Sequence, residues 1–324
     1  MPQLPMARAI NQALREEMRR SEDVVVLGED VGKKGGVFLV TEGLLDEFGP
    51  ERVMDTPLSE SGIIGFAMGL AMAGLRPVAE IQFVDFIYQG FEELINHVAK
   101  LRYRSGNEFA SPLVVRAPYG PGVRVGLYHS QSPETYFIHT PGLIVVTPSS
   151  PYNAKGLLKA AVRGEDPVVF LEPKRIYWSP KEEVPEEDYV VELGRGRVAR
   201  EGRDVTVITY GASVWDALKA ADEVAGDISV EVIDLMTLWP LDINLVLSSV
   251  KKTGRLVVVH EAPRTLGLGA EISALVAEKA VEYLAAPVVR VTGPDVPTAP
   301  ISLEDLYMPN PARIKGGIMR AMKY

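Results

Sequence analysis

Residues 24–28 read Val-Val-Val-Leu-Gly, a short run that is apolar throughout and rich in β-branched side chains. A strand with one solvated face alternates apolar and polar residues, whereas a continuous apolar run suits a parallel strand covered on both faces. The residues before it, 5–20, repeat apolar side chains three and four positions apart, which predicts an amphipathic helix. A helix joined to a doubly covered strand indicates an α/β sheet.

The same alternation of strand and helix continues through the first half of the chain. Further strand-like runs lie at 77–83, 113–116, 143–146 and 168–171. Helical patterns lie between them at about 41–48, 60–74, 86–103, 133–139 and 152–163. The regular alternation predicts a doubly wound parallel sheet.

A charged, proline-bearing stretch interrupts this pattern. Residues 172–192 combine prolines with a dense run of acidic side chains, a composition typical of a linker, which we place at 176–192. Strand-like and helical segments then alternate again. The strands are expected at 205–210, 229–234, 255–260 and 288–292, and the helices at about 213–225, 242–252, 268–284 and 310–322. We therefore expect two α/β domains, 1–175 and 193–324.

Composition excludes several classes of function. The 324 residues carry 34 Lys and Arg against 43 Asp and Glu, and the net charge of −9 disfavours binding to a phosphate backbone. The absence of cysteine excludes disulfides, thiolate nucleophiles and Cys-ligated metal centres. No apolar run approaches the roughly 20 residues that span a bilayer, and the N-terminus lacks the apolar core of a signal peptide. We expect a cytoplasmic protein that binds neither nucleic acid nor membrane.

Glycine-rich loops invite a nucleotide-binding interpretation that their spacing does not support. The loop at 28–34 lacks the GxxxxGK[ST] pattern of a P-loop, and the loop at 120–126 is one residue too long for GxGxxG. The glycines at 267 and 269 have no third partner. These glycines are better explained as turn and packing residues.

The first segment that could carry chemistry is 55–62, Asp-Thr-Pro-Leu-Ser-Glu-Ser-Gly, which leads into a helix that is apolar on all sides. Such a helix should be buried, so Glu60 is expected at the first turn of a buried helix. The simple explanation is a carboxylate stabilised by the helix dipole. The alternative is a carboxylate in a partly dry site that exchanges a proton with a ligand.

The second segment is 126–134, Gly-Leu-Tyr-His-Ser-Gln-Ser-Pro-Glu. Ser132 suits an N-cap and Pro133 the first helical position, so His129 should lie in a loop beside a helix start. A histidine there can exchange a proton near neutral pH, or it can simply bond a backbone carbonyl. His139, ten residues on, is better explained as structural.

The third segment is 80–88, where a strand is expected to end and a helix to begin. Ligands of open α/β sheets bind at the carboxyl ends of the strands. The aromatic side chains of Phe83, Phe86 and Tyr88 suit the wall of a flat ring as well as they suit a core.

At these segments the chain resembles a known family, the beta subunits of the decarboxylase component of 2-oxo acid dehydrogenase complexes, which belong to the transketolase-like thiamine diphosphate superfamily. Matching motifs occur in order from about residue 26 to residue 263 and cover most of the chain. They are VLGEDVGKKGGVF, TPLSESGI, GLRPVAEIQF, AKLRYRSG, LYHSQSPE, AKGLLKAA, VVFLEPK, EVIDLMTLWPLD and KTGRLVVVHEAP.

The resemblance implies a fold and a set of site residues. The domains would be a thiamine diphosphate pyrimidine-binding domain and a transketolase-type C-terminal domain. Glu60 would exchange a proton with a ring nitrogen of the aminopyrimidine, Phe86 would pack near that ring, and Leu58 and Gln82 would line the same pocket. His129 would take part in proton transfer when a lipoyl group is reductively acylated.

The resemblance also implies partners. The chain has no GDG…N motif for magnesium and diphosphate, so no metal ligand is expected from its side chains, and a partner alpha subunit would hold Mg²⁺ in an alpha2-beta2 heterotetramer. The substrate would be pyruvate or a branched-chain 2-oxo acid, and the acyl acceptor the lipoyl group of a dihydrolipoyl acyltransferase core. Relatives of this kind also hold potassium through backbone carbonyls, which here would lie near Leu113 and Asp166, although the matching side chains differ.

Three other functions compete with this one. The C-terminal subunit of a split transketolase would need a basic, histidine-rich phosphate pocket, which four histidines and a net charge of −9 disfavour. A scaffold subunit would keep the fold without the chemistry. A nicotinamide dehydrogenase would need the phosphate loop that the glycine spacing lacks.

Overall fold

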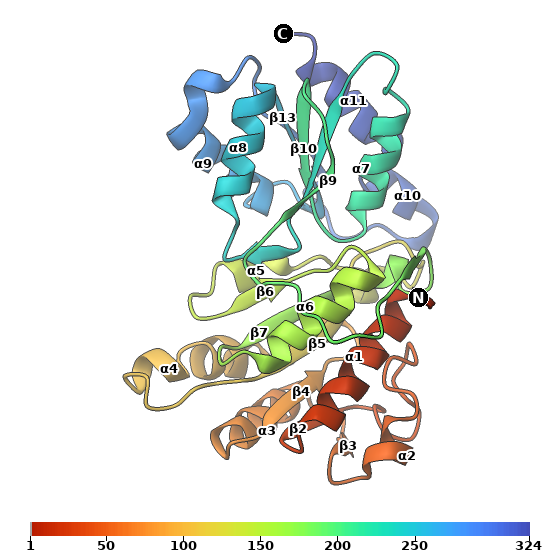
Figure 1. The fold of residues 1–324 in the computed structure, drawn as a ribbon, viewed down its shortest axis with the longest axis vertical. Coiled ribbons are helices and arrows are strands. Elements are labelled where there is room, and N and C mark those ends of the chain that lie inside the picture. Colours follow the sequence, from red (N-terminus) through yellow and green to blue (C-terminus); the bar gives the residue numbers. More distant parts are fainter. Residues whose placement is uncertain (1) are drawn as a thin grey trace. The chain divides into compact units, whose positions relative to one another are not determined.

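The computed structural model describes residues 2–324, and the contacts within the chain divide it into two units (Figure 1). The first unit contains the chain up to Tyr119 together with 136–193, and the second contains 120–135 together with 194–324. The segment 120–135, which the sequence-based boundaries assign to the first domain, thus groups with the second unit.

The first unit is built on a parallel sheet with the strand order β6-β7-β5-β4-β2-β3. Its strands are β1 (Gln3–Pro5), β2 (Val24–Gly28), β3 (Val53–Asp55), β4 (Arg76–Glu80), β5 (Val114–Tyr119), β6 (Ile144–Val146), β7 (Val168–Pro173) and β8 (Lys181–Glu183). Strand β2 lies between β3 and β4, and all five of its residues are buried. The apolar run 24–28 is therefore a doubly covered parallel strand, as predicted. The short strands β1 and β8 pair antiparallel outside this sheet.

Helices flank this sheet. They are α1 (Met6–Arg20), α2 (Leu44–Phe48), α3 (Glu60–Met72), η1 (Val84–Gly90), η2 (Glu93–Val98), α4 (Leu101–Arg104), α5 (Glu134–Ile138), α6 (Pro151–Arg163) and η4 (Lys174–Ile176). The first two residues of α5 group with the second unit. Helix α1 buries Met6, Ile10 and Leu14 and packs beside α6 (Figure 1). Helix α3 packs against β4 and η1. The predicted amphipathic helix at 5–20 is confirmed.

The helix predicted over 86–103 is wrong as one element. The structure breaks it into the 3₁₀ helix η1, the π-helix η2 and the short helix α4. Gly90, at the end of η1, lies so close to α3 that an added Cβ would be 2.8 Å from the Glu60 carbonyl oxygen and 2.6 Å from Ile64 Cδ1. The spacing of apolar residues predicts a helix but does not show that two segments come so close together. The backbone near this contact adopts 3₁₀ and π turns in place of a regular α-helix.

A buried ionic network joins three neighbouring strands of the first unit. Arg116 of β5 donates from Nε and Nη2 to the two carboxylate oxygens of Glu172 on β7 (2.7 and 3.0 Å), and from Nη1 to Glu80 on β4 (2.8 Å). Tyr177 donates its hydroxyl to Glu172. All four side chains are buried. Burial raises the pKa of Glu80, and the neighbouring carboxylates raise that of Arg116 despite its burial, so Arg116 is held in its charged form.

The stretch 176–192, which the sequence suggests is a linker, packs against the first unit. Lys155 of α6 donates to the Pro185 carbonyl oxygen (2.7 Å), and Tyr189 stacks on Tyr152 with ring centroids 4.5 Å apart. Asp188 contacts Arg163 at 2.6 Å, so part of its acidic charge is matched by α6. Contacts of this kind allow the polar stretch 176–192 to pack against the surface of the first unit.

The second unit has the strand order β14-β13-β10-β11-β9, in which only β9 runs antiparallel among the described pairs. Its strands are β9 (Arg197–Arg200), β10 (Val205–Thr209), β11 (Val230–Asp234), β12 (Thr237–Trp239), β13 (Leu256–Pro263) and β14 (Val289–Gly293). Its helices are η3 (Leu127–His129), α7 (Ser213–Asp222), α8 (Ile243–Thr253), α9 (Leu268–Ala280), η5 (Val281–Tyr283), η6 (Ile301–Leu303), α10 (Glu304–Tyr307) and α11 (Pro311–Ala321). Helices α7 and α11 flank one side of the sheet, and α8 and α9 the other (Figure 1).

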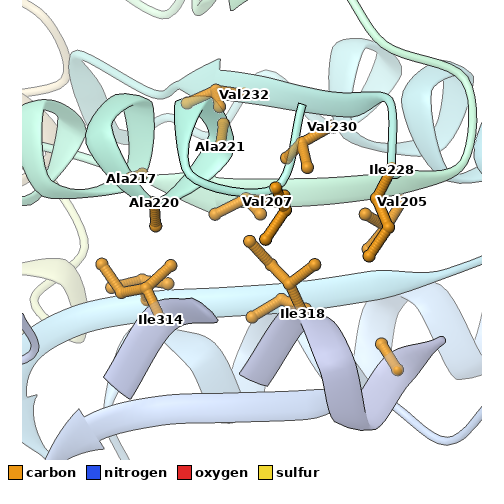
Figure 2. Packing of buried hydrophobic residues seen from close by; sticks show 14 of the residues in the cluster. Val205, Val207, Ala217, Ala220, Ala221, Ile228, Val230, Val232, Ile314 and Ile318 are labelled. Carbon is orange, nitrogen blue, oxygen red and sulfur yellow. The ribbon is translucent and has the colours of Figure 1, made fainter. Parts of the chain in front are cut away.

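Strand β10 contacts the helices on both faces of this sheet. Val205 and Val207 point into an apolar cluster with Ala217 of α7 and Ile318 of α11 (Figure 2). Thr206, between the two valines, faces the other way, where its hydroxyl is 2.7 Å from the hydroxyls of two residues of α8. Side chains of a strand alternate between the two faces, so one strand supplies an apolar contact to one layer and a hydrogen bond to the other.

Within residues 2–324, no helix combines the length and apolar character needed to cross a bilayer.

Candidate functional site

A hollow of about 490 Å³ opens in the first unit at the start of α3. It is lined by Leu58, Ser59, Glu60, Ser61, Asp85, Phe86 and Gln89. The residues come from the turn before α3 and from η1, two segments that the sequence analysis selected independently. Glu60 is 9% exposed and lines this hollow together with Phe86, so the site combines a largely buried acidic residue with an aromatic one.

Local interactions fix the start of α3 and thereby Glu60. Ser59 is the N-cap, and its hydroxyl accepts the Gly62 N–H (3.3 Å). Glu60 is the first residue of the helix, where free backbone N–H groups favour a negative charge. The absence of a side chain at Gly90 allows η1 to approach this first turn, which brings Asp85 and Phe86 to the same hollow as Glu60. Phe86 is held edge-to-face against Phe83, with ring centroids 5.9 Å apart.

A second carboxylate lies within electrostatic reach of Glu60. The pKa of Glu29 is raised, first by burial and then by the negative charges of Asp30 and Glu60. Glu29 follows β2 directly, at the carboxyl end of a central strand, which is the edge where ligands of α/β sheets bind. Glu60 and Asp85 line the hollow, and Glu29 is close enough to add to its negative charge.

The structure brings together three of the four residues expected around a ring, namely Leu58, Glu60 and Phe86. Gln82 is not among the side chains that line the hollow, because its amide donates to Asp30 instead (3.4 Å). Sequence reasoning did not single out Asp85 or Gln89 as lining residues. Their place in the sequence could have identified them, since both lie within seven residues after the strand end at 80–83, where ligands of α/β sheets bind.

The helix α3 was expected to be buried on all sides, and this expectation is wrong for the chain by itself. Phe66 is 51% exposed and Met72 46%, and Gly62 and Gly69 are exposed on the same helix. A hydropathy pattern indicates that a surface is buried, but not whether the same chain or a partner buries it. An exposed apolar helix beside the hollow is typical of a surface that a partner covers.

His129 lies in the segment that groups with the second unit. It ends the short helix η3, and its backbone N–H donates to the Gly126 carbonyl oxygen (3.2 Å). The segment is fastened to the second unit at several points. The Gly122 N–H donates to Glu304, Arg124 pairs with Asp305 (2.9 Å), and Glu134 accepts a hydrogen bond from Tyr210 (2.6 Å).

Glu134, at the end of that segment, is fully buried and has an unusual protonation equilibrium. Burial, with a smaller contribution from the charge of Glu261, raises its pKa from 4.5 to about 7, against the lowering effect of the Tyr210 hydrogen bond. Between these pH values the folded chain therefore holds a proton that the unfolded chain has lost. The stability this proton gives is complete below about pH 4.5 and disappears as the pH rises through about 7.

Replacing Glu134 with Gln should remove this pH dependence, because the amide mimics the neutral carboxyl group and still accepts the Tyr210 hydroxyl. The wild-type chain should lose on the order of 3 kcal/mol of stability between pH 4.5 and 8 through this group. We expect the Glu134→Gln variant to have the higher melting temperature at pH 8 and a similar one at pH 5. Thermal unfolding at both pH values measures this, with the exposed Glu278→Gln as control. Equal shifts at both pH values would contradict it.

The residues expected near a potassium ion have partners within the chain. The Leu113 carbonyl oxygen accepts the Val168 N–H (2.9 Å), and the Asp166 carboxylate lies 3.1 Å from Arg102 Nε. The potassium site stays a prediction.

Comparison with known families matches both halves of the chain. Residues 2–179 match the pyrimidine-binding domain of transketolase, and residues 194–314 match the transketolase C-terminal domain. A solved structure described as "Split gene transketolase, inactive beta4 tetramer" superposes with a TM-score of 0.82 over 99% of both chains, at 25% sequence identity. The two predicted α/β domains are thus those of the transketolase architecture.

Curated relatives are closer in sequence. The chain is 50% identical to the 2-oxoisovalerate dehydrogenase subunit beta of Bacillus subtilis over 98% of both chains. It is also 50% identical to the pyruvate dehydrogenase E1 component subunit beta of Staphylococcus epidermidis, and to that of Bacillus subtilis, over 96% of each chain. Identity is thus equal toward relatives named for two different 2-oxo acids.

Proposed function

This chain belongs to the beta subunits of the first component of the pyruvate and branched-chain 2-oxo acid dehydrogenases, and we propose that its Glu60 hollow receives the aminopyrimidine ring of thiamine diphosphate. The observation that carries the proposal is the pairing of the buried Glu60 carboxylate with the Phe86 ring around one hollow of about 490 Å³. The two groups suit a flat, nitrogen-bearing ring, because an aromatic side chain can pack on it while a carboxylate accepts from a ring N–H.

The cofactor, when bound, supplies the electron sink for decarboxylation. The role proposed for Glu60 is to hold or release one proton at its carboxylate as the neighbouring ring nitrogen changes its protonation. The helix N-terminus stabilises the charged carboxylate, and its low exposure strengthens the interaction with a ring N–H. Leu58 and Phe86 would exclude water from the contact and orient the ring.

Because the chain is a beta subunit, it works with an alpha subunit. The proposal assigns to that partner the ligands of Mg²⁺ and of the diphosphate, since the GDG…N motif is absent from this chain. The exposed apolar side chains of α3, Phe66 and Met72, support a partner surface next to the Glu60 hollow. We propose an alpha2-beta2 heterotetramer in the cytoplasm that passes its acyl group to the lipoyl arm of an acyltransferase core.

Co-expression with the alpha subunit tests this function directly. The complex should decarboxylate a 2-oxo acid only when both chains, thiamine diphosphate and Mg²⁺ are present. Parallel assays with pyruvate and 3-methyl-2-oxobutanoate decide the substrate, which equal identities to both kinds of relative do not. Turnover without the cofactor, or by either chain alone, would refute the proposal.

His129 should act after decarboxylation. Replacing it with Gln should lower acylation of a lipoyl domain by about 10²–10⁴-fold, the usual contribution of a general acid or base. Decarboxylation measured with an artificial electron acceptor should fall much less, because that assay bypasses the lipoyl group. The exposed His139→Gln serves as a control and should leave both rates unchanged. Equal losses in the two assays would contradict the role.

A further inference from the structure

A hollow of about 530 Å³ in the second unit has a strongly basic wall. Four arginines contribute to its wall, Arg264, Arg290, Arg313 and Arg320, against one carboxylate, Asp295. The chain as a whole carries a net charge of −9, so this local excess is opposite in sign to the rest of the protein.

The hollow occupies a place in the sheet where ligands commonly bind. Arg264 follows the end of β13 directly, and Asp295 comes two residues after the end of β14. The carboxyl ends of two adjacent parallel strands thus meet here, at the edge of an open α/β sheet. Helix α11, which packs against β14, supplies Arg313 from its first turn and Arg320 from its last.

Hydrogen bonds to carbonyl oxygens hold three of the four guanidinium groups in place. Arg264 and Arg290 each donate to the other's carbonyl oxygen (3.1 Å both ways), and Arg313 donates to three carbonyl oxygens, including that of Thr292 at 2.6 Å. In residues 2–324, none of the four guanidinium groups forms an ion pair with a carboxylate. A guanidinium group that is already fixed in place loses less conformational entropy when it binds an anion.

The one acidic group of the wall, Asp295, interacts mainly with Thr265 and to a smaller extent with Arg264, whose charge also lowers its pKa. Asp295 accepts hydrogen bonds from the backbone N–H and the hydroxyl of Thr265 (2.8 and 2.7 Å). The arginines also repel one another. Burial and, after it, the charge of Arg320 lower the pKa of Arg313. An anion in the hollow would relieve this repulsion.

We propose that this hollow, lined by Arg264, Arg290, Arg313 and Arg320, is a binding site for a phosphate group. Guanidinium groups on separate walls match the several oxygens of a tetrahedral dianion, and a carboxylate offers less charge to the same number of donors. A volume of about 530 Å³ falls in the range of small-molecule sites, so the phosphate is free or belongs to a small phosphorylated molecule.

The alpha–beta complex saturated with thiamine diphosphate and Mg²⁺ is the form to test, because its cofactor site is then filled. Isothermal titration with inorganic phosphate and with AMP, and with adenosine as the probe lacking phosphate, separates the two sources. Binding of inorganic phosphate alone indicates the free ion, and tighter binding of AMP indicates a phosphate ester. Adenosine should not bind.

A double variant, Arg264→Glu with Arg320→Glu, should weaken binding by about 30-fold or more, the loss expected when charge-assisted contacts are removed. Both side chains are exposed and neither supports the core. A control pair on the same unit, Arg203→Glu with Lys279→Glu, changes the net charge equally and should bind like the wild type. The neutral pair Arg264→Gln with Arg320→Gln should also lose affinity, which separates loss of contacts from repulsion.

Three results would overturn the proposal. They are no binding of either phosphate probe, equal binding by the double variant and the wild type, and equal loss in the control pair. None of these measurements uses turnover, so they are independent of the function proposed for the Glu60 hollow. Circular dichroism and the melting temperature of each variant show whether it has folded.

Discussion

Replacing Glu60 with Gln should lower decarboxylation by the alpha–beta complex by about 10²–10⁴-fold, the range lost when a general acid or base is removed. The amide keeps the size and polarity of the carboxyl group but cannot take up a proton. The KM for the 2-oxo acid should change little, since Glu60 is proposed to meet the cofactor ring and not the substrate. Steady-state kinetics at saturating thiamine diphosphate and Mg²⁺ measure the effect.

The same substitution should leave the fold almost intact. Glu60 sits at the first turn of α3, where loss of its negative charge costs about 0.3–1 kcal/mol through the helix dipole. A melting temperature near that of the wild type would therefore accompany the loss of activity. The exposed Glu51→Gln is a matched control in the same unit and should be fully active. Activity of the Glu60→Gln complex above a tenth of the wild-type value would refute the proton-transfer role.

Replacing Arg116 with Met should cost about 3–5 kcal/mol of stability, the effect of removing one partner from a buried ion pair. The change leaves the carboxylates of Glu80 and Glu172 buried in the sheet without their shared cation. The pKa of Glu80 is already raised by burial and should rise further once Arg116 is gone. Urea unfolding, or failure to obtain the protein in soluble form, would show the effect.

Two further variants test whether the loss of stability comes from the buried ionic network. Arg116→Lys keeps a positive charge but loses the two parallel hydrogen bonds to Glu172, so its stability should lie between those of the wild type and Arg116→Met. Arg102→Met removes an arginine from a pair with Asp166 whose side chains are 35% and 46% exposed, and it should cost less than about 1 kcal/mol. An Arg116→Met protein as stable as Arg102→Met would contradict the account of the network.

Much of the fold follows from local sequence patterns. The run 24–28 is apolar because both faces of β2 are covered, and the spacing in 5–20 reflects the single face that α1 buries. Both properties depend on neighbours a few residues away along the chain, so the sequence alone is enough to predict them. The same holds for Glu60, which the apolar run after it places at a helix start and which is the first residue of α3.

Other features depend on contacts between distant segments and left no periodic signal. The break of the expected helix 86–103 arises where Gly90 meets α3, and neither segment by itself predicts that meeting. The resemblance places Gln82 in the pocket, but its amide donates to Asp30, 52 positions away in the sequence. The grouping of 120–135 with the second unit depends on partners such as Tyr210 and Glu304.

That last grouping has a consequence for the order in which the protein is made. Synthesis proceeds from the N-terminus at roughly 5–20 residues per second, and early segments fold as soon as their partners have emerged. The segment that carries His129 leaves the ribosome before Tyr210, and well before Glu304 and Asp305, to which it is fastened. After residue 135, about 170 further residues must be made before the last of these three partners, Asp305, exists. The contacts with Tyr210, Glu304 and Asp305 can therefore form only late in synthesis, and a chain truncated after residue 193 lacks all three of them.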